Sequence, residues 1–273
     1  MADAGTTRGG AEPLNAARLR AALGGPATMW TDIRVVAETG STNEDALKQA
    51  VDGAPEGLVI AAEWQTAGRG RQGRRWLAGP GAALTFSALL RPQPVPQATR
   101  GWIPLLAGVA AARGLRQMAG VDARLKWPND VLADGGKLAG LLAEQCGDAV
   151  VVGIGVNVLG SEPDLPVATA TSLERCGAGG TDRTALLAAI LRELEHRYLR
   201  WRATGPGDAV ASGLQREYRS LCDTLGRQIR VQLPGGRELA GQAVDVDPAG
   251  QLLVSPHRGE LVAVSAGDVV HVR

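Results

Sequence analysis

Lysine is rare in this chain, so the positions that keep it are informative. The sequence has three lysines against 26 arginines, and two of the three, Lys126 and Lys137, lie close together. Arginine presents a rigid fork of five donors, whereas lysine carries a compact ammonium on a flexible stem. A rotatable ammonium can follow an anionic oxygen that moves during a reaction. Together with the arginine-rich loop described next, the two lysines mark a candidate site for a carboxylate and phosphates.

A loop rich in glycine and arginine, residues 68–75, precedes these lysines. Its glycines allow the backbone to approach a ligand closely, and Arg69 and Arg71 offer paired donors to carboxylate or phosphate oxygens. Without an anion the loop has like charges and little apolar anchoring, so we expect it to be mobile and to become ordered on binding. A solvated basic turn is the alternative for such a run taken alone.

The same loop excludes two familiar kinds of nucleotide site. Gly68, Gly70 and Gly73 match the dinucleotide-binding pattern Gly-x-Gly-x-x-Gly, but no helix is expected after Gly73 and residues 86–94 contain no carboxylate. The sequence also lacks the P-loop pattern. A nucleotide bound here is therefore held in another way.

Composition bounds the class of protein. Apolar residues make up 45% and charged residues 21% of the chain, as in ordinary globular proteins, and the formal net charge is +1. A near-neutral chain is poorly suited to bind nucleic acid or a membrane surface. Cys146, Cys176 and Cys222 form neither a disulfide framework nor a zinc pattern, and we expect buried thiols in a cytoplasmic protein. No signal peptide, membrane-spanning run or N-terminal helix-turn-helix domain is expected.

Strand and helix patterns alternate along the chain and must position these residues. Helices are expected at residues 15–23, with Asn15 as cap, and at residues 41–50, 102–118 and 184–201. Strands are expected at residues 33–37, 58–62, 83–90, 125–127, 137–145 and 149–157. Ser41 or Thr42 should cap the second helix while the other faces a pocket. This order favours an α+β fold, in which helices pack on a mixed β-sheet.

The composition changes near Gly226. Short alternating runs separated by turn signals follow, with no helical pattern, and predict a small β-barrel. We therefore expect a disordered or short helical N-terminal segment at residues 1–28, a domain that carries the site at residues 29–225, and a C-terminal β-domain at residues 226–273.

Five motifs occur in one order along the chain. They are ETGSTN at residues 38–43, QTAGRGR at residues 65–71 with Trp76 beyond it, KWPND at residues 126–130, GKLAG at residues 136–140 and GIGVN at residues 153–157. Together they resemble the biotin protein ligases, also called biotin–acetyl-CoA-carboxylase ligases or holocarboxylase synthetases, over roughly residues 30–273. The resemblance implies a catalytic core similar to that of the class II aminoacyl-tRNA synthetases, with an SH3-like domain appended.

The resemblance also implies a two-step reaction that uses biotin, ATP and Mg²⁺. Biotin and ATP would form biotinyl-5′-AMP and pyrophosphate, and a lysine of the biotin carboxyl carrier protein of acetyl-CoA or acyl-CoA carboxylases would then accept the biotin. Joining a carboxylate to an α-phosphate brings two anions together, so fixed cations and Mg²⁺ must offset their repulsion. The neutral ureido ring of biotin suits hydroxyl and amide side chains.

Residues that match the motifs carry the roles that the resemblance implies. Biotin would contact Ser41, Thr42, Asn43, Gln65, Arg69, Gly70, Arg71 and Lys137. The nucleotide would contact Gly68, Arg69, Trp76, Lys126, Asn129 and Asn157. The catalytic residues would be Lys137, Arg69, Arg71 and Asp130. Asp130 would also hold the metal or activate the acceptor lysine, and the alternative for Asp130 is a turn cap.

Three other functions remain open. A lipoate–protein ligase would use the same chemistry on a different acyl group, although the motifs look more like the biotin branch. A non-catalytic regulator would bind nucleic acid through the arginine loop, with strong salt dependence. A structural module with a vestigial site is the third. For a biotin protein ligase we expect a carrier protein as partner, no nucleic acid, no membrane, and a monomer or weak homodimer.

Overall fold

The structure is a computed structural model that describes residues 12–24, 28–160, 169–233 and 235–272. Its α-helices are α1 (Ala16–Leu23), α2 (Thr42–Val51), α3 (Trp102–Ala119), α4 (Arg183–Arg202) and α5 (Leu214–Leu221). The strands of the larger sheet are β1 (Asp32–Thr39), β2 (Leu58–Gln65), β3 (Ala83–Leu90), β4 (Arg124–Lys126), β5 (Asp130–Ala133), β6 (Gly136–Cys146) and β7 (Ala149–Asn157). The strands of the smaller sheet are β8 (Gln228–Gln232), β9 (Glu238–Val246), β10 (Leu252–Pro256), β11 (Val262–Val264) and β12 (Asp268–His271).

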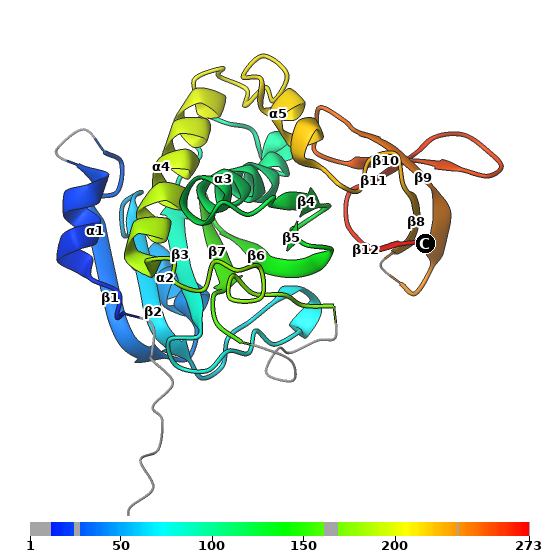
Figure 1. Cartoon of the computed structure of the whole chain (residues 1–273). Coiled ribbons are helices and arrows are strands. Elements are labelled where there is room, and N and C mark those ends of the chain that lie inside the picture. The colour runs from blue at the N-terminus through cyan, green and yellow to red at the C-terminus, as the bar shows by residue number, and fades with distance from the viewer. Residues whose placement is uncertain (1–11, 25–27, 161–168, 234, 273) are drawn as a thin grey trace, which may run out of the picture.

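The larger sheet is mixed, as the sequence predicts. Its strand order is β1-β2-β3-β7-β6-β5-β4, with β1 and β2 parallel and the other neighbours antiparallel. Every residue of β3 is buried, because helices cover both of its faces. Helices α3 and α4 pack on one face together with the main apolar cluster, and α2 packs on the other through Ala46 and Ala50 (Figure 1). The predicted mixed sheet with packed helices is confirmed.

The smaller sheet contains the last strands of the chain. It is antiparallel throughout, in the order β11-β10-β9-β8-β12, and it curls on itself beside the larger sheet (Figure 1). Residues of β8 alternate between exposed and buried, as expected for a strand with one face on a core. This small antiparallel sheet confirms the predicted SH3-like C-terminal fold.

Two tryptophans join the sheets. Trp102 Nε1 donates to the carbonyl of Pro248 at 2.7 Å, and Trp127 Nε1 donates to the carbonyl of Gly250 at 3.3 Å. Both indole rings are at most 2% exposed and belong to the same apolar cluster as the buried residues of β8 and β10. The turn between β9 and β10 is therefore fixed against the larger unit, and Trp127 is a core residue.

His271 lies at this junction, and burial with the nearby Lys126 lowers the pKa of its imidazole to about 4. Its Nε2 is 3.2 Å from Thr224 Oγ1. Between pH 6.5 and about 4 the unfolded chain binds a proton at this position that the folded chain does not, so stability falls as the pH falls through that window. We expect His271→Gln to flatten this part of the stability profile. Thermal unfolding measured from pH 4 to pH 8 checks this, and equal slopes for both proteins would contradict it.

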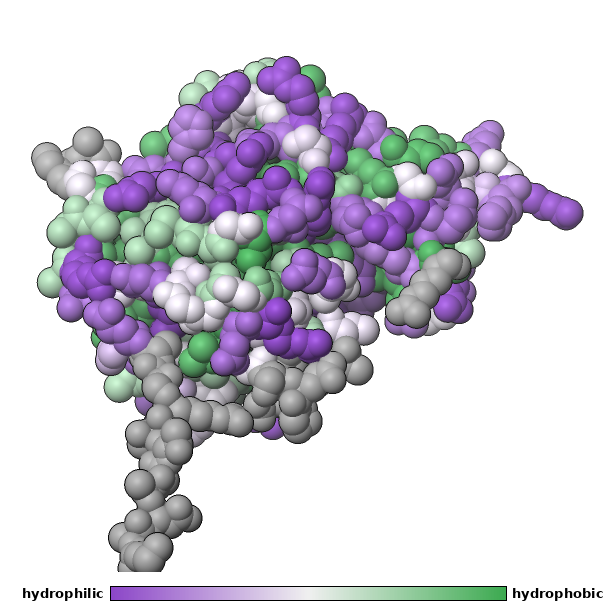
Figure 2. Space-filling model, in the orientation of Figure 1, coloured by the Kyte–Doolittle hydropathy of each residue, from purple (hydrophilic) through white to green (hydrophobic). Residues whose placement is uncertain are grey.

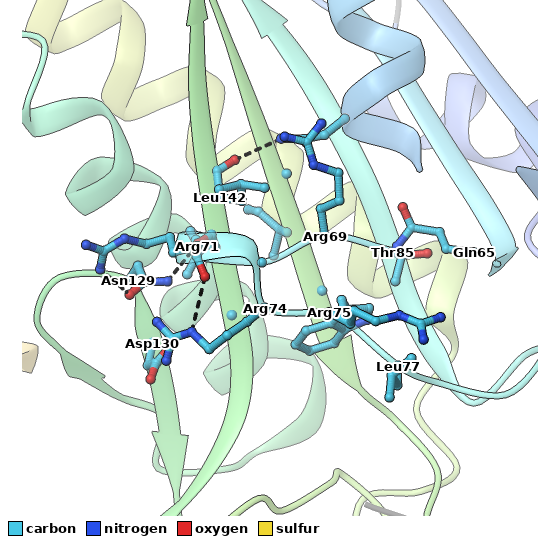
Figure 3. Close-up of a pocket in the computed structure, with 18 of the residues that line it drawn as sticks. Gln65, Arg69, Arg71, Arg74, Arg75, Leu77, Thr85, Asn129, Asp130 and Leu142 are labelled. Atoms are coloured by element: carbon cyan, nitrogen blue, oxygen red, sulfur yellow. Dashed lines mark hydrogen bonds between the residues drawn. The ribbon is translucent and has the colours of Figure 1, made fainter. Parts of the chain in front are cut away.

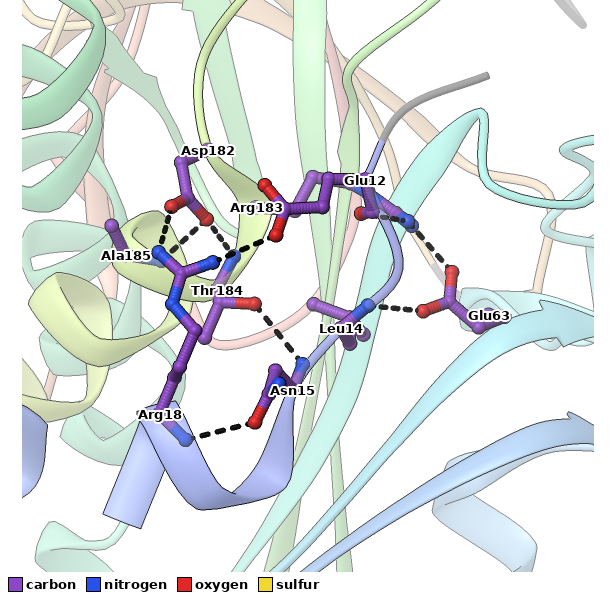
Figure 4. A network of polar contacts seen from close by, with 9 residues as sticks. All are labelled: Glu12, Leu14, Asn15, Arg18, Glu63, Asp182, Arg183, Thr184 and Ala185. Carbon is purple, nitrogen blue, oxygen red and sulfur yellow. Dashed lines mark hydrogen bonds and ion pairs between the residues drawn. The ribbon is translucent and has the colours of Figure 1, made fainter. Parts of the chain in front are cut away.

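The N-terminal helix is fastened to the sheet by a polar network (Figure 4). Asn15 caps α1, as predicted, because its side chain accepts from the backbone N–H of Arg18 at 2.9 Å. Arg183 is 1% exposed at its side chain and donates to Glu63 Oε2 at 2.7 Å and to the carbonyl of Glu12 at 2.8 Å. The predicted short helix is thus present, whereas residues 1–11 and 25–27 of the predicted N-terminal segment lie outside the described residues.

The predicted burial of the cysteines is wrong for two of the three. Cys222 is buried, but Cys146 and Cys176 are partly exposed, because Cys146 ends β6 at a tight turn and Cys176 lies in a surface loop.

Hydrophilic residues cover most of the face drawn in Figure 2, with apolar ones scattered among them. In the part of the chain that the structure describes, no helix is both long and apolar enough to cross a bilayer.

Candidate active site

A cavity of about 510 Å³ opens on the face of the larger sheet that carries α2. The start of α2, the end of β2, the loop at residues 66–77 and strands β6 and β7 surround it. The predicted site residues that line it are Ser41, Thr42, Asn43, Gln65, Arg69, Gly70, Arg71, Trp76, Lys126, Asn129, Asp130, Lys137 and Asn157. Gly68 stands outside the lining and under the backbone of Trp76, where an added Cβ would lie 2.6 Å from the Trp76 carbonyl oxygen. Five separated motifs therefore converge on one pocket.

The N-terminal cap of α2 differs from the prediction. Neither Ser41 nor Thr42 caps α2 with its side chain. Gln65 Oε1 instead accepts from the backbone N–H of Thr42 at 2.8 Å and lies 3.1 Å from Thr42 Oγ1. Since Gln65 comes from the end of β2, the helix start and the strand end are locked together. Thr42 and Ser41 are both at most 3% exposed and line the pocket.

Asn43 is held in one orientation by three groups. Its Nδ2 donates to Glu144 Oε2 at 2.8 Å and to the carbonyl of Leu142 at 3.3 Å, and its Oδ1 accepts from Ser87 Oγ at 2.6 Å. Gly153 leaves the space for this amide, because a Cβ there would lie 2.2 Å from Asn43 Oδ1. Both amide protons are used within the protein, so Asn43 can offer a ligand only its remaining acceptor capacity.

The arginine loop lies over strands β6 and β7 (Figure 3). After Gly73 the chain turns into extended backbone and does not open an α-helix, which confirms that the glycine pattern is not a dinucleotide-binding one. Arg69 donates to Glu144 Oε1 at 2.7 Å and to Glu44 Oε1 at 3.3 Å. The loop also carries Arg74, which the sequence argument did not single out. Mobility of the unliganded loop stays a prediction.

The smaller sheet reaches this loop through one carboxylate. Asp268 of β12 pairs with Arg74 at 2.9 Å and lies 4.0 Å from Arg71. Arg71 also donates to Asn129 Oδ1 at 2.9 Å. Burial lowers the pKa of the Arg71 guanidinium, and the charge of Asp268 partly opposes that effect. No local signal in the sequence marks Asp268, since its partners lie almost two hundred residues earlier.

The two clustered lysines line the same cavity. A two-residue turn with positive φ at Asp134 and Gly135 joins β5 to β6 and reverses the chain direction. Lys137 Nζ lies 2.6 Å from Asp130 Oδ1. Burial lowers the pKa of Lys126, and Lys137 lowers it further while Asp130 opposes the shift. The pair of ammonium groups is thus held beside a single carboxylate.

Trp76 lies flat against two glycines of the pocket wall. A Cβ on Gly155 would lie 2.5 Å from its ring and one on Gly140 3.3 Å from it, so only glycine leaves room for the indole. Its Nε1 is buried and has no hydrogen-bond partner among the described residues. An unpaired buried donor is costly and suits a ligand acceptor. Asn157, by contrast, donates to the carbonyl of Thr171 at 2.9 Å and supports the wall.

Asp130 is the residue of this pocket best placed to hold a metal ion. Its Oδ1 is buried, pairs with Lys137 and has no further hydrogen-bond partner among the described residues. Nowhere in the described ranges do three or more His, Cys, Asp or Glu side chains gather as a metal cage. Mg²⁺ is commonly held by one or two carboxylates together with substrate phosphates and water, and one carboxylate beside a cationic pocket fits that pattern.

The structure thus combines a mixed sheet that carries a polar and cationic pocket with a small antiparallel sheet docked beside it. Residues 35–159 match the biotin/lipoate A/B protein ligase family, and residues 224–272 match the biotin protein ligase C terminal domain. The biotin–[acetyl-CoA-carboxylase] ligase of Mycobacterium tuberculosis is 44% identical over 96% of this chain and 97% of its own length. The chain belongs to the biotin protein ligase family.

Solved structures agree with this placement. A biotin protein ligase from Aquifex aeolicus in complex with biotin and ATP is similar with a TM-score of 0.73 and 26% identity, covering 89% of this chain and 99% of that one. A biotin protein ligase from Leishmania major in complex with biotinyl-5-AMP is similar with a TM-score of 0.59 and 25% identity, covering 86% of this chain and 99% of that one. The catalytic core and the C-terminal sheet thus both have counterparts in this family.

Proposed function

We propose that this chain is an ATP-dependent biotin protein ligase. It forms biotinyl-5′-AMP from biotin and ATP and then transfers the biotin to a lysine of the biotin carboxyl carrier protein of an acetyl-CoA or acyl-CoA carboxylase. The observation that carries the proposal is one cavity whose lining combines neutral polar side chains, such as Thr42 and Gln65, with cations, such as Arg69 and Lys137. The relative that is 44% identical over nearly the whole chain supports the choice of substrate.

In the first step a biotin carboxylate oxygen attacks the α-phosphorus of ATP, and pyrophosphate leaves. Two anions meet, so the barrier depends on cations already in place. Lys137 contacts the carboxylate and the α-phosphate and follows the shared oxygen as the anhydride forms. Arg69 and Arg71 close over the phosphate from the loop side. Mg²⁺, with Asp130 among its holders, supplies further charge stabilisation when bound.

Before substrates bind, the main cations already have partners inside the protein. Asp130 lies beside Lys137, Glu144 beside Arg69, and Asp268 beside Arg74. These carboxylates offset the cost of gathering like charges in a partly buried pocket. Substrate anions must share or replace them, so the cations bind substrate from fixed positions and need little reorganisation.

In the second step the amine of the acceptor lysine attacks the carbonyl of the mixed anhydride, and AMP leaves. The attacking amine must be neutral, so a base has to accept its proton. Asp130 fits this role because its carboxylate lies at the cavity wall, next to Lys126 and Lys137. Until the carrier arrives, the loop over the anhydride shields it from water.

The remaining assignments follow from this function. We propose that biotin occupies the pocket end at Ser41, Thr42, Asn43 and Gln65, and that Trp76 packs on the adenylate with its unpaired Nε1 toward an acceptor. Gly68, Lys126, Asn129 and Asn157 form or support the nucleotide side. The protein acts in the cytoplasm with a carrier protein as partner and without nucleic acid or membrane, as a monomer or weak homodimer.

Mass spectrometry of a carrier protein tests the proposal. The carrier, incubated with this chain, biotin and Mg-ATP, should gain the mass of one biotinyl group at a single lysine. The same mixture with lipoate in place of biotin should leave it unmodified, which separates this function from lipoate–protein ligase. Modification by lipoate alone, or no modification with either acid, would refute the assignment.

A further inference from the structure

We infer that Glu144 is a positioning residue that joins the biotin end of the pocket to the cationic loop. The inference rests on the proposed function and adds a residue that no motif contains. Glu144 lies on β6, is 22% exposed at its side chain and does not line the cavity itself. One oxygen accepts from Asn43 Nδ2 at 2.8 Å, and the other accepts from Arg69 at 2.7 Å.

The chemistry of its two partners requires a carboxylate. Asn43 Nδ2 and the guanidinium of Arg69 are both donors, and each takes a different oxygen of Glu144. A glutamine at this position would offer one acceptor and one donor, so it could satisfy either partner but not both. The residue therefore connects two substrate-facing groups in a way that its closest isostere cannot.

The Asn43 side of this connection is rigid. Ser87 is fully buried and donates to Asn43 Oδ1 at 2.6 Å, while Thr42 Oγ1 lies 2.8 Å from the Ser87 hydroxyl. The backbone at Gly153 closes the space on the remaining side. Glu144 is thus fixed relative to the pocket floor, and the direction of its second oxygen is fixed as well.

The Arg69 side is more exposed to solvent and depends on Glu144 for its direction. Arg69 is 43% exposed on a glycine-rich loop. Its other carboxylate partner is Glu44, at a longer N–O distance of 3.3 Å. The Glu44 side chain is 44% exposed, so solvent weakens that ion pair. The ion pair with Glu144 has the shorter N–O distance, and Glu144 is the better buried of the two carboxylates. Glu144 therefore holds the guanidinium where the loop lies over β6. Order in the biotin end is thereby transmitted to the loop that closes over the adenylate.

Three single variants of the full chain test the coupling: Glu144→Gln, Glu144→Ala and Glu44→Gln. Biotin affinity is measured by calorimetry, and release of preformed biotinyl-AMP is measured by a chase. With Glu144→Gln we expect release about threefold to fivefold faster, the scale of one partly exposed ion pair. Glu144→Ala also removes the hydrogen bond from Asn43 Nδ2, so biotin affinity should fall roughly tenfold as well. Glu44→Gln removes a carboxylate from the same arginine and should change neither quantity.

A double-mutant cycle tests whether Glu144 affects adenylate release through Arg69. In an Arg69→Gln background, Glu144→Gln should have no further effect on release, because its partner is already gone. Thermal unfolding of each variant shows that the fold survives, and if Glu144→Ala fails to fold, the isosteric Glu144→Gln decides the question. Slower release or tighter biotin binding in Glu144→Gln would mean that Glu144 only competes with the substrate for Arg69, and would overturn the inference. Equal effects from Glu44→Gln would overturn it as well. If the unaltered chain forms no biotinyl-AMP, the proposed function itself fails.

Discussion

Replacing Lys137 with alanine is expected to slow formation of biotinyl-AMP by about a hundredfold to a thousandfold, the usual effect of removing one group that stabilises developing charge. The ammonium lies beside Asp130 at the cavity wall, and no other described lysine except Lys126 lines the pocket. Biotin-dependent exchange of pyrophosphate into ATP measures the step directly. The affinity for biotin should fall much less, because Ser41, Thr42 and Gln65, the neutral side chains proposed to contact biotin, are unchanged.

Two further variants sharpen that experiment. Lys137→Arg keeps the charge but replaces a rotatable ammonium with a planar fork, so most of the activity should stay lost. Lys48→Ala removes the third lysine of the chain, which lies on α2 outside the cavity, and should leave exchange unchanged. Full exchange by Lys137→Ala would remove this residue from its assigned role.

Replacing Gly153 with alanine is expected to weaken biotin binding by roughly tenfold to a hundredfold, since the new methyl group would stand 2.2 Å from Asn43 Oδ1. Nothing else in the strand opposes the change, because Gly153 has ordinary extended backbone within β7. Asn43 would have to leave Ser87 and Glu144, and each lost hydrogen bond costs about 1 kcal/mol or more. Calorimetric titration with biotin measures the effect.

The cause of that loss can be isolated with a second variant. In an Asn43→Ala background the clashing amide is absent, so Gly153→Ala should cost little further affinity. An equal loss in both backgrounds would mean that the methyl group acts on the ligand or on another neighbour, and would contradict the packing of Asn43 described here.

The sequence predicted those parts of the fold that local pattern controls. Residues 83–90 and 149–157 form strands with the predicted bounds, because continuous β-branched or apolar runs suit strands that are buried on both faces. Asn15 caps α1 as expected. Lys137 lies beside Asp130 because a short Asp-Gly turn folds β6 back onto β5, and such turns are readable from sequence.

The parts that could not be predicted depend on contacts between distant segments. Either Ser41 or Thr42 was expected to cap α2 with its side chain, yet the side chain of Gln65, at the end of β2, accepts from the first backbone N–H of the helix. Asp268 reaches the loop only because the small sheet docks on the larger one. The motif GIGVN was recognised, but the need for Gly153 follows from the position of Asn43 across the sheet.

The most direct test of the account is to look for the intermediate without any carrier present. Purified chain, mixed with biotin and Mg-ATP and then quenched, should yield about one biotinyl-AMP per active site on chromatography, with pyrophosphate in equal amount, and neither should form when biotin is omitted. Release of pyrophosphate without biotin, or the absence of biotinyl-AMP when both substrates are present, would contradict the claim that this pocket joins a carboxylate to an α-phosphate.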